Sequence, residues 1–144
     1  MYNHILVPVD GSDQTPLAVK AACELAEALD ARVTIFHSAH FQFEPSYAEN
    51  TAFSIQHQDS FQNEAKRHAS VVLQNAANLA TVTTEQQFVL SNYPANAIVD
   101  AALKYHCDLI VMASHGYRGI KGLLLGSETQ KVLTHTKIPV LVVR

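Results

Sequence analysis

The chain has 144 residues, 48% of them hydrophobic and 16% charged, which is typical of one compact folded domain and argues against a disordered chain. Its net charge of −3 and the lack of a basic run argue against binding to nucleic acid. No apolar run approaches the roughly 20 residues of a membrane helix, and no cationic leader precedes an apolar core. We therefore expect a single cytoplasmic domain over 1–144, without a membrane partner.

Short apolar runs alternate with segments in which apolar residues recur every three or four positions. The runs predict strands and the segments between them predict helices. The predicted strands are 5–9, 32–37, 85–90, 109–112 and 139–143. The predicted helices are 15–29, with Pro16 at the first helical position, then 59–80, 95–105 and 128–135. Residues 38–58 show no clear period, and we expect them to be functional, mobile or a partial lid.

This alternation predicts an α/β fold, a parallel sheet with helices on both faces. In such folds ligands bind outside the carboxyl ends of strands, where the strand order reverses. Turn residues end the first strand at Pro8-Val9-Asp10-Gly11 and the fourth strand at Met112–Gly116. If these two strands are neighbours, Asp10 and the second turn face one crevice, which Ser38 at the exit of the second strand would border.

A glycine-rich stretch follows the fourth strand and leads into a helix. Glycines stand at positions 116, 119, 122 and 126, and Ser127 follows the last of them. Glycine lets backbone N–H groups approach a phosphate closely, and the first N–H groups of a helix are unpaired and carry partial positive charge. Arg118 and Lys121 add positive charge to the same stretch. The pattern predicts a site for the phosphates of a nucleotide.

Three stretches resemble the universal stress protein family. They are the opening ILVPVDGS, the closing KIPVLVVR, and a motif that reads Gly-x-x-Gly, nine residues, then Gly-Ser or Gly-Thr in nucleotide-binding members. Here the motif is Ala113-Ser114-His115-Gly116, nine residues, then Gly126-Ser127. The resemblance spans the whole chain. It implies a five-stranded parallel sheet of order 3-2-1-4-5, Rossmann-like and similar to the adenine nucleotide alpha hydrolases.

The resemblance also implies a ligand, ATP or AMP, with Mg²⁺ as an optional companion. It places adenine and ribose near Pro8, Val9, Asp10 and Ser38. It places the phosphates against Met112, Ala113, Gly116, Gly126, Ser127 and Thr129, with Ser114 and His115 inside the same motif. It further implies a homodimer through the last strand, Pro139–Val143. The function expected from it is a nucleotide-binding regulatory module of the stress response.

Two positions depart from the family pattern. Ala113 replaces the first glycine of the motif, and a required positive φ there would cost about 1–3 kcal/mol. If the glycine serves only close approach, the methyl group merely crowds one phosphate oxygen, and we expect this milder case. Asn92 stands where many relatives have glycine before x-Pro, and asparagine tolerates the left-handed region, so this change should be nearly silent.

Several site residues also have a structural interpretation. Ser127 could donate to a phosphate or cap its helix, because Ser127 and Gln130 fit the S-x-x-Q capping box. Asp10 could accept from the ribose hydroxyls or the adenine amine, bind Mg²⁺, or cap its own turn. Cys23 and Cys107 lack metal-ligand neighbours and read as reduced packing thiols, and the scattered histidines do not predict a zinc site.

Two other functions remain open at the level of sequence. The Ser114-His115 pair suggests a hydrolase, but the G-x-S-x-G elbow fails because Met112 occupies the position of its first glycine. Slow ATP hydrolysis or self-phosphorylation on a nearby Ser or Thr is the enzymatic alternative, without a P-loop or kinase signature to support it. The other alternative is a nucleotide-free module that acts through its dimer surface.

Overall fold

The computed structural model describes residues 1–41, 51–116 and 125–144, with the side chains of 51–57 left undescribed. Every predicted strand and helix is present, most of them within one residue of the expected bounds. The elements are β1 (His4–Pro8), α1 (Thr15–Leu29), β2 (Arg32–Ala39), α2 (Thr51–Asn78), β3 (Thr84–Leu90), α3 (Pro94–Lys104), β4 (Leu109–Ala113), α4 (Ser127–His135) and β5 (Val140–Val143).

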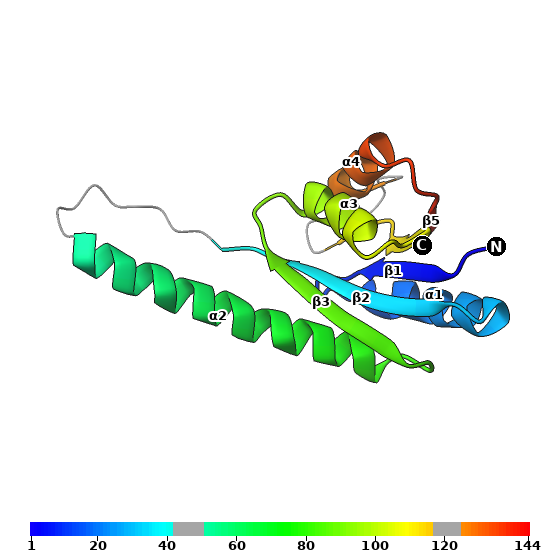
Figure 1. Ribbon diagram of the computed structural model, residues 1–144, viewed down its shortest axis with the longest axis horizontal. Helices are drawn as coiled ribbons and strands as arrows, with labels where there is room; N and C mark the ends of the chain where they lie inside the picture. Colours follow the sequence, from blue (N-terminus) through cyan, green and yellow to red (C-terminus); the bar gives the residue numbers. More distant parts are fainter. Residues whose placement is uncertain (42–50, 117–124) are drawn as a thin grey trace.

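The second helix is where the sequence prediction was wrong. It begins at Thr51, so residues 51–58 of the stretch predicted to be irregular are helical. Figure 1 shows the reason: the first turns of α2 extend past the ends of the strands. A helix segment with no sheet to cover needs no apolar stripe, so its period is hidden in the sequence. A smaller correction concerns α1, whose N-cap is Gln14, so that Pro16 is its second residue.

The five strands form one sheet in the order β3-β2-β1-β4-β5, and all paired strands are parallel. The predicted fold class and strand order are confirmed. β1 lies at the centre with β2 on one side and β4 on the other. The chain leaves β1 and β4 in opposite directions, so the carboxyl ends of these two strands form the switch point at which α/β folds bind ligands.

Alternate residues of the strands pack on opposite faces of the sheet. In β1, Ile5 and Val7 join the core beneath α1 and α2, whereas Leu6 joins the core beneath α3 and α4. Figure 1 shows these two pairs of helices on the two sides of the sheet. Because both faces are covered, the central strands are apolar on both faces. None of the described helices is long and apolar enough to cross a membrane.

Candidate functional site

The turn after β1 is fixed by its own side chains and by β2. The Val9 N–H donates to the Phe36 carbonyl at 2.8 Å. Asp10 Oδ1 accepts the N–H of Ser12 at 2.9 Å, and Gly11 between them has φ +79°. The predicted capping role of Asp10 is therefore confirmed. Its second oxygen, Oδ2, lies against Gly116 in the turn after β4.

His37 in β2 also holds this turn, through the Val9 carbonyl, a role that was not predicted from the sequence. Its side chain is buried, and Nδ1 lies 2.7 Å from the Val9 carbonyl. Because a carbonyl only accepts, Nδ1 carries the proton. Burial lowers the pKa of His37, and the nearby His68 lowers it further, against opposing effects of the Val9 carbonyl and Asp10. Its period-two spacing from the buried Ile35 is the sequence signal that it faces α2.

The end of β4 is tied to the start of α4 by three hydrogen bonds. The Gly126 N–H donates to the Ser114 carbonyl at 2.6 Å. The buried Thr129 hydroxyl lies 3.1 Å from the Ala113 carbonyl and 3.3 Å from that of Ser114. Ser114 in turn donates its N–H to the Val143 carbonyl of β5 at 2.8 Å. Gly126 and Thr129 thus hold the frame of the motif, with the Gly126 N–H already engaged.

Ala113 causes no backbone strain where it replaces the motif's first glycine. Among the described non-glycine residues, positive φ occurs only at Asp30 and His106. The strained alternative is therefore not realised, and the methyl group of Ala113 packs against the core below α1. The expected milder case, a methyl group that affects only the space beside a ligand, remains a prediction.

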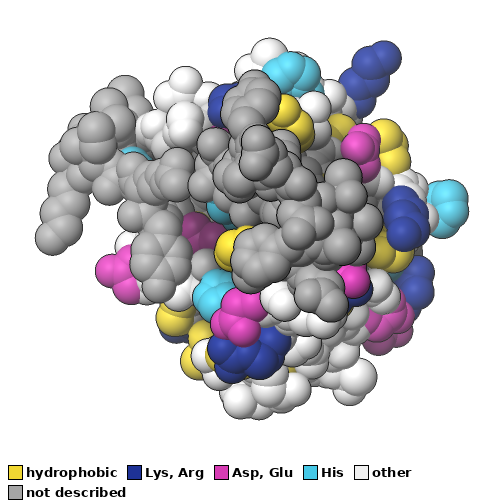
Figure 2. All heavy atoms as spheres, turned by 90° about the vertical axis from the view of Figure 1, so that its left-hand side faces the viewer, with side chains coloured by type: hydrophobic (Ala, Val, Ile, Leu, Met, Phe, Trp, Pro, Cys, Tyr) yellow, Lys and Arg dark blue, Asp and Glu magenta, His cyan; other side chains and the backbone are white. Residues whose placement is uncertain are grey.

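Gly116 lies where the turn after β4 meets the turn after β1. A Cβ built on Gly116 would collide with the Asp10 carboxylate. The turn after β4 therefore lies against the turn after β1, as the switch-point argument predicts, and a side chain at position 116 would require the Asp10 carboxylate to move. Figure 2 shows the molecule from the end at which β2 leaves the sheet, with acidic and histidine side chains at the surface of that face.

The first turn of α4 corrects the capping-box prediction. The N-cap is Gly126, without a side-chain cap, and Ser127 is already inside the helix. The Gln130 side chain donates instead to the Leu125 carbonyl at 3.1 Å. The exposed Ser127 hydroxyl therefore does not cap the helix. The first N–H groups of α4 lack intrahelical acceptors, as at any helix start.

Glu128, whose role was not predicted from the sequence, has its carboxylate engaged by α3 and by Lys131. Its Oε2 accepts the N–H of Ala95 in the first turn of α3 at 3.0 Å, and its Oε1 pairs with Lys131 at 2.8 Å. The Glu128 carboxylate therefore stabilises the start of α3 through the dipole of that helix. The sequence signal for it is an acidic residue in the first turn of α4.

Side-chain hydrogen bonds hold the exit of β2, and that Ser38 borders the ligand site stays a prediction. The half-buried Ser38 donates its hydroxyl to the Ser91 carbonyl at 3.3 Å, and Asn92 Oδ1 accepts the Phe41 N–H at 3.1 Å. These contacts join the exit of β2 to the turn after β3. Asn92 does not adopt the left-handed conformation that its family counterpart, glycine, would permit.

The remaining predicted residues divide by location. Pro8 ends β1 half-buried, while Met112 is 6% exposed and packs in the core beneath α3 and α4. The Met112 side chain therefore belongs to the core, so that a ligand contact at Met112 would have to involve its backbone. Arg118 and Lys121 lie outside the described residues.

Ser114 and His115 form a hydrogen-bonded pair that does not resemble a catalytic dyad. Ser114 Oγ lies 2.8 Å from His115 Nδ1, but Ser114 is only 2% exposed, so its hydroxyl is shielded from a substrate. His115 Nε2 is buried and has no hydrogen-bond partner within the described part of the chain. Over that part, no group of three or more His, Cys, Asp or Glu side chains could hold a metal ion.

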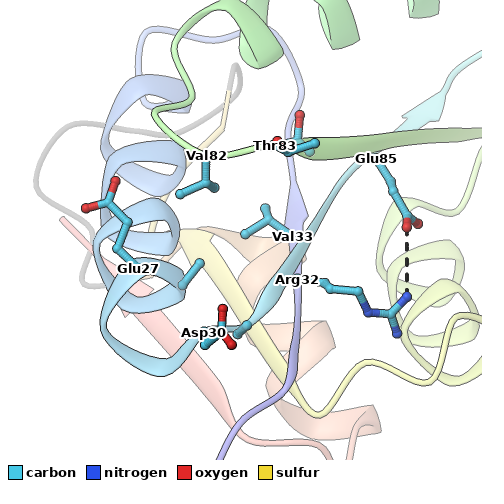
Figure 3. A pocket seen from close by; sticks show the side chains of 10 residues that line it. Glu27, Asp30, Arg32, Val33, Val82, Thr83 and Glu85 are labelled. Carbon is cyan, nitrogen blue, oxygen red and sulfur yellow. Dashed lines mark ion pairs between the residues drawn. The ribbon is translucent and has the colours of Figure 1, made fainter.

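A separate pocket of about 390 Å³ lies at the opposite, amino end of the sheet (Figure 3). It lies between the end of α1 and the starts of β2 and β3. Its charged rim is largely paired internally: Arg32 lies 3.8 Å from Glu85, and Glu27 accepts from the Thr81 hydroxyl at 2.7 Å. The ion pair and the hydrogen bond leave these charged groups of the pocket engaged within the protein.

Comparison with known proteins decides the family. The model of the universal stress protein family matches residues 1–144. The chain belongs to this family. It is 34% identical over 144 residues to the universal stress protein in the QAH/OAS sulfhydrylase 3′ region of Thermus aquaticus, with all of both chains covered. Universal stress protein YxiE of Bacillus subtilis is 32% identical, again with both chains fully covered.

Solved structures agree with the family and with the fold. The protein MJ0577 is 27% identical with a TM-score of 0.73, and the match covers 99% of this chain and 96% of that one. A universal stress protein in complex with cAMP is 28% identical with a TM-score of 0.72, covering 99% of this chain and 97% of that one. The cAMP complex shows that a universal stress protein of this fold holds an adenine nucleotide.

Proposed function

We propose that this universal stress protein binds an adenine nucleotide, ATP or AMP, in the crevice between the ends of β1 and β4. The observation that carries the proposal is the contact of Asp10 with Gly116, which joins the two turns at the sheet's switch point. The cAMP complex of a similar structure supports the ligand class. In the stress response, occupancy of the crevice would alter the surface that partner proteins meet.

Each end of the ligand has its own residues in this proposal. Adenine and ribose lie near Pro8, Val9, Asp10 and Ser38, with Asp10 accepting from the ribose hydroxyls or sharing Mg²⁺ with the phosphates. The phosphates lie against the backbone of Met112, Ala113 and Gly116, beside the N–H and hydroxyl of Ser127. Gly126 and Thr129 act indirectly, because their hydrogen bonds set the position of this helix start.

The test begins with the nucleotide that copurifies. Acid extraction of freshly purified protein, followed by chromatography, should release an adenine nucleotide. Calorimetric titration with AMP, ATP, cAMP and GMP, each with Mg²⁺ or EDTA, then ranks the ligands. Adenine nucleotides should bind in the micromolar range, which requires about 8 kcal/mol. Equal affinity for GMP and AMP would contradict the proposal.

Asp10→Asn provides the residue-level test. The amide oxygen can still accept the Ser12 N–H, so the turn should survive, whereas the carboxylate charge is lost. We expect AMP to bind about tenfold more weakly, equivalent to about 1.4 kcal/mol. Asp13→Asn is the matched control, since Asp13 is exposed in the same turn. An unchanged Asp10→Asn affinity would remove Asp10 from the site.

We also propose a homodimer through β5. This strand lies at the edge of the sheet, and Leu141 in it is 39% exposed. An uncovered edge presents unpaired N–H and C=O groups, and a two-fold axis pairs two such edges at once. Light scattering should give the mass of a dimer for the natural chain and of a monomer for Leu141→Lys. A natural chain that is monomeric at 100 micromolar, or a Leu141→Lys variant that stays dimeric, would overturn this interface.

A further inference from the structure

We infer that His115 Nε2–H is a hydrogen-bond donor to the phosphate of the bound nucleotide, fixed in that tautomer by Ser114. The inference rests on the proposed function and adds a specificity-determining side chain to it. A ligand with a phosphate should gain affinity through His115, whereas a nucleoside without one should not.

The tautomer follows from the burial of Ser114. The residue is only 2% exposed, and its hydroxyl lies 2.8 Å from His115 Nδ1. If Nδ1 carried the proton and donated to Oγ, the buried hydroxyl proton would need a further acceptor, and the described residues supply none. The hydroxyl therefore donates to Nδ1. In a neutral imidazole the proton then resides on Nε2.

The protonated Nε2 is a buried donor without an acceptor. No described residue accepts from it, although nearly all buried donors in native proteins have a partner. Such a group is costly to desolvate unless a ligand supplies the acceptor. The missing partner must therefore offer an oxygen or nitrogen lone pair.

The surroundings of His115 select an anion as that partner. A Cβ on Gly126, the N-cap of α4, would lie 3.4 Å from the Cα of His115, so the histidine backbone adjoins the start of this helix. The helix start carries partial positive charge, and α4 has nine residues to supply it. Glu128, the carboxylate closest in sequence to this start, is paired with Ala95 N–H and Lys131. His115 is followed in the chain by Gly116, which lies against the Asp10 carboxylate.

Two substitutions separate the nitrogens of the ring. His115→Gln can place an amide N–H where Nε2 stands, whereas His115→Asn reaches only as far as Nδ1. We expect His115→Asn to weaken AMP binding about tenfold while adenosine binding changes less than twofold. His115→Gln should keep AMP affinity within about threefold of the natural chain. His135→Asn, at the far end of α4, is the matched control and should leave both ligands unchanged.

Calorimetry with AMP and adenosine distinguishes the ways to fail. If the natural chain binds neither, the proposed function is wrong and this inference is lost with it. If AMP binds and His115→Asn retains the natural ratio of AMP to adenosine affinity, the site stands and the His115 assignment is wrong. Equal losses for AMP and adenosine also overturn it, because a phosphate donor would affect only AMP. Thermal melting of each variant confirms that it is folded.

Nitrogen-15 NMR of the imidazole tests the tautomer without any change in affinity. The natural chain should show a protonated Nε2 and an unprotonated Nδ1, and AMP should shift the Nε2 resonance while adenosine leaves it in place. Ser114→Ala should release the preference for one tautomer. A protonated Nδ1 in the free protein, or an Nε2 resonance that ignores AMP, would refute the inference.

Discussion

Among the described residues, both ring nitrogens of His4 are paired at the amino end of the sheet, whereas one ring nitrogen of His115 at the carboxyl end is not. At the amino end, His4 Nε2 lies 2.8 Å from the Thr34 hydroxyl, and Arg32 donates to its Nδ1 at 3.3 Å. At the carboxyl end, His115 Nδ1 is paired with Ser114, while Nε2 has no acceptor in the described ranges. The closed network indicates a structural role, and the open one indicates a place for a ligand.

Asp108 extends this contrast at the amino end. Its carboxylate accepts the N–H of Asn3 at 2.9 and 3.0 Å and the N–H of His4 at 2.9 Å, which ties β1 to the start of β4. Cys107 beside it is buried, and burial raises the pKa of its thiol to about 11. A thiol of that pKa is unreactive near neutral pH. The amino end is thus built from satisfied or inert groups.

The largest expected effect comes from Asp108→Ala, which removes the hydrogen-bond acceptor at the amino end of the sheet. The change leaves the buried His4 N–H and the Asn3 N–H without their charged acceptor, so we expect the free energy of unfolding to fall by about 3 kcal/mol. Urea unfolding measures this loss. AMP affinity should stay within about twofold, because the crevice lies at the other end. Asp100→Ala on the exposed side of α3 is the control and should cost less than about 0.5 kcal/mol.

The same carboxylate predicts a pH dependence. Partial burial alone would raise the pKa of Asp108, but the N–H groups of His4 and Asn3 outweigh it and hold the pKa below its usual 3.8. A lowered folded pKa adds stability that is present above the unfolded value and is lost as pH falls through the folded one. Lowering the pH below about 4 should therefore reduce the free energy of unfolding of the natural chain more than that of Asp108→Asn. Parallel pH profiles for the two would show that Asp108 does not contribute.

The second prediction in size concerns Gly116→Ala, which disturbs the contact with Asp10 at the carboxyl end of the sheet. The added methyl group collides with the Asp10 carboxylate, so we expect AMP to bind about tenfold more weakly and stability to fall by about 1–2 kcal/mol. Calorimetry and urea unfolding measure the two effects.

A double-mutant cycle shows whether Asp10 is the cause. In an Asp10→Ala background the collision is removed, and Gly116→Ala should then cost less than about 0.5 kcal/mol of stability. An equal cost in both backgrounds would mean that Gly116 is required for another reason.

The contrast between the two ends was only partly visible in the sequence. The strand order and the meeting of Asp10 with Gly116 could be predicted, because apolar runs, turn residues and the family motif are local patterns. The engaged Gly126 N–H could not, because it depends on how α4 docks on the end of β4. His37 and Glu128 were missed since their partners, Val9 and Ala95, are more than 25 residues away.

The capping box shows the limit of motif arguments at this site. Ser127 and Gln130 have the right spacing, yet the helix starts one residue earlier than the box requires. A register difference of one residue decides whether the Ser127 hydroxyl caps the helix or remains for a ligand. Helix ends are the least certain part of any pattern-based prediction, because they depend on tertiary contacts such as Gly126 with Ser114.

The smallest expected effect, from Ala113→Gly, tests whether the carboxyl end tolerates its departure from the family motif. Ala113 is half-buried at the end of β4 with an ordinary backbone conformation, so glycine relieves no strain. Glycine adds flexibility to the unfolded chain and loses a methyl contact with the core, so stability should fall by about 0.5–1 kcal/mol. AMP affinity should stay within about threefold in calorimetry. An affinity gain of tenfold or more would show that the methyl group crowds the phosphate. The space for a ligand would then be limited by Ala113, beside the His115 Nε2 that lacks a partner among the described residues.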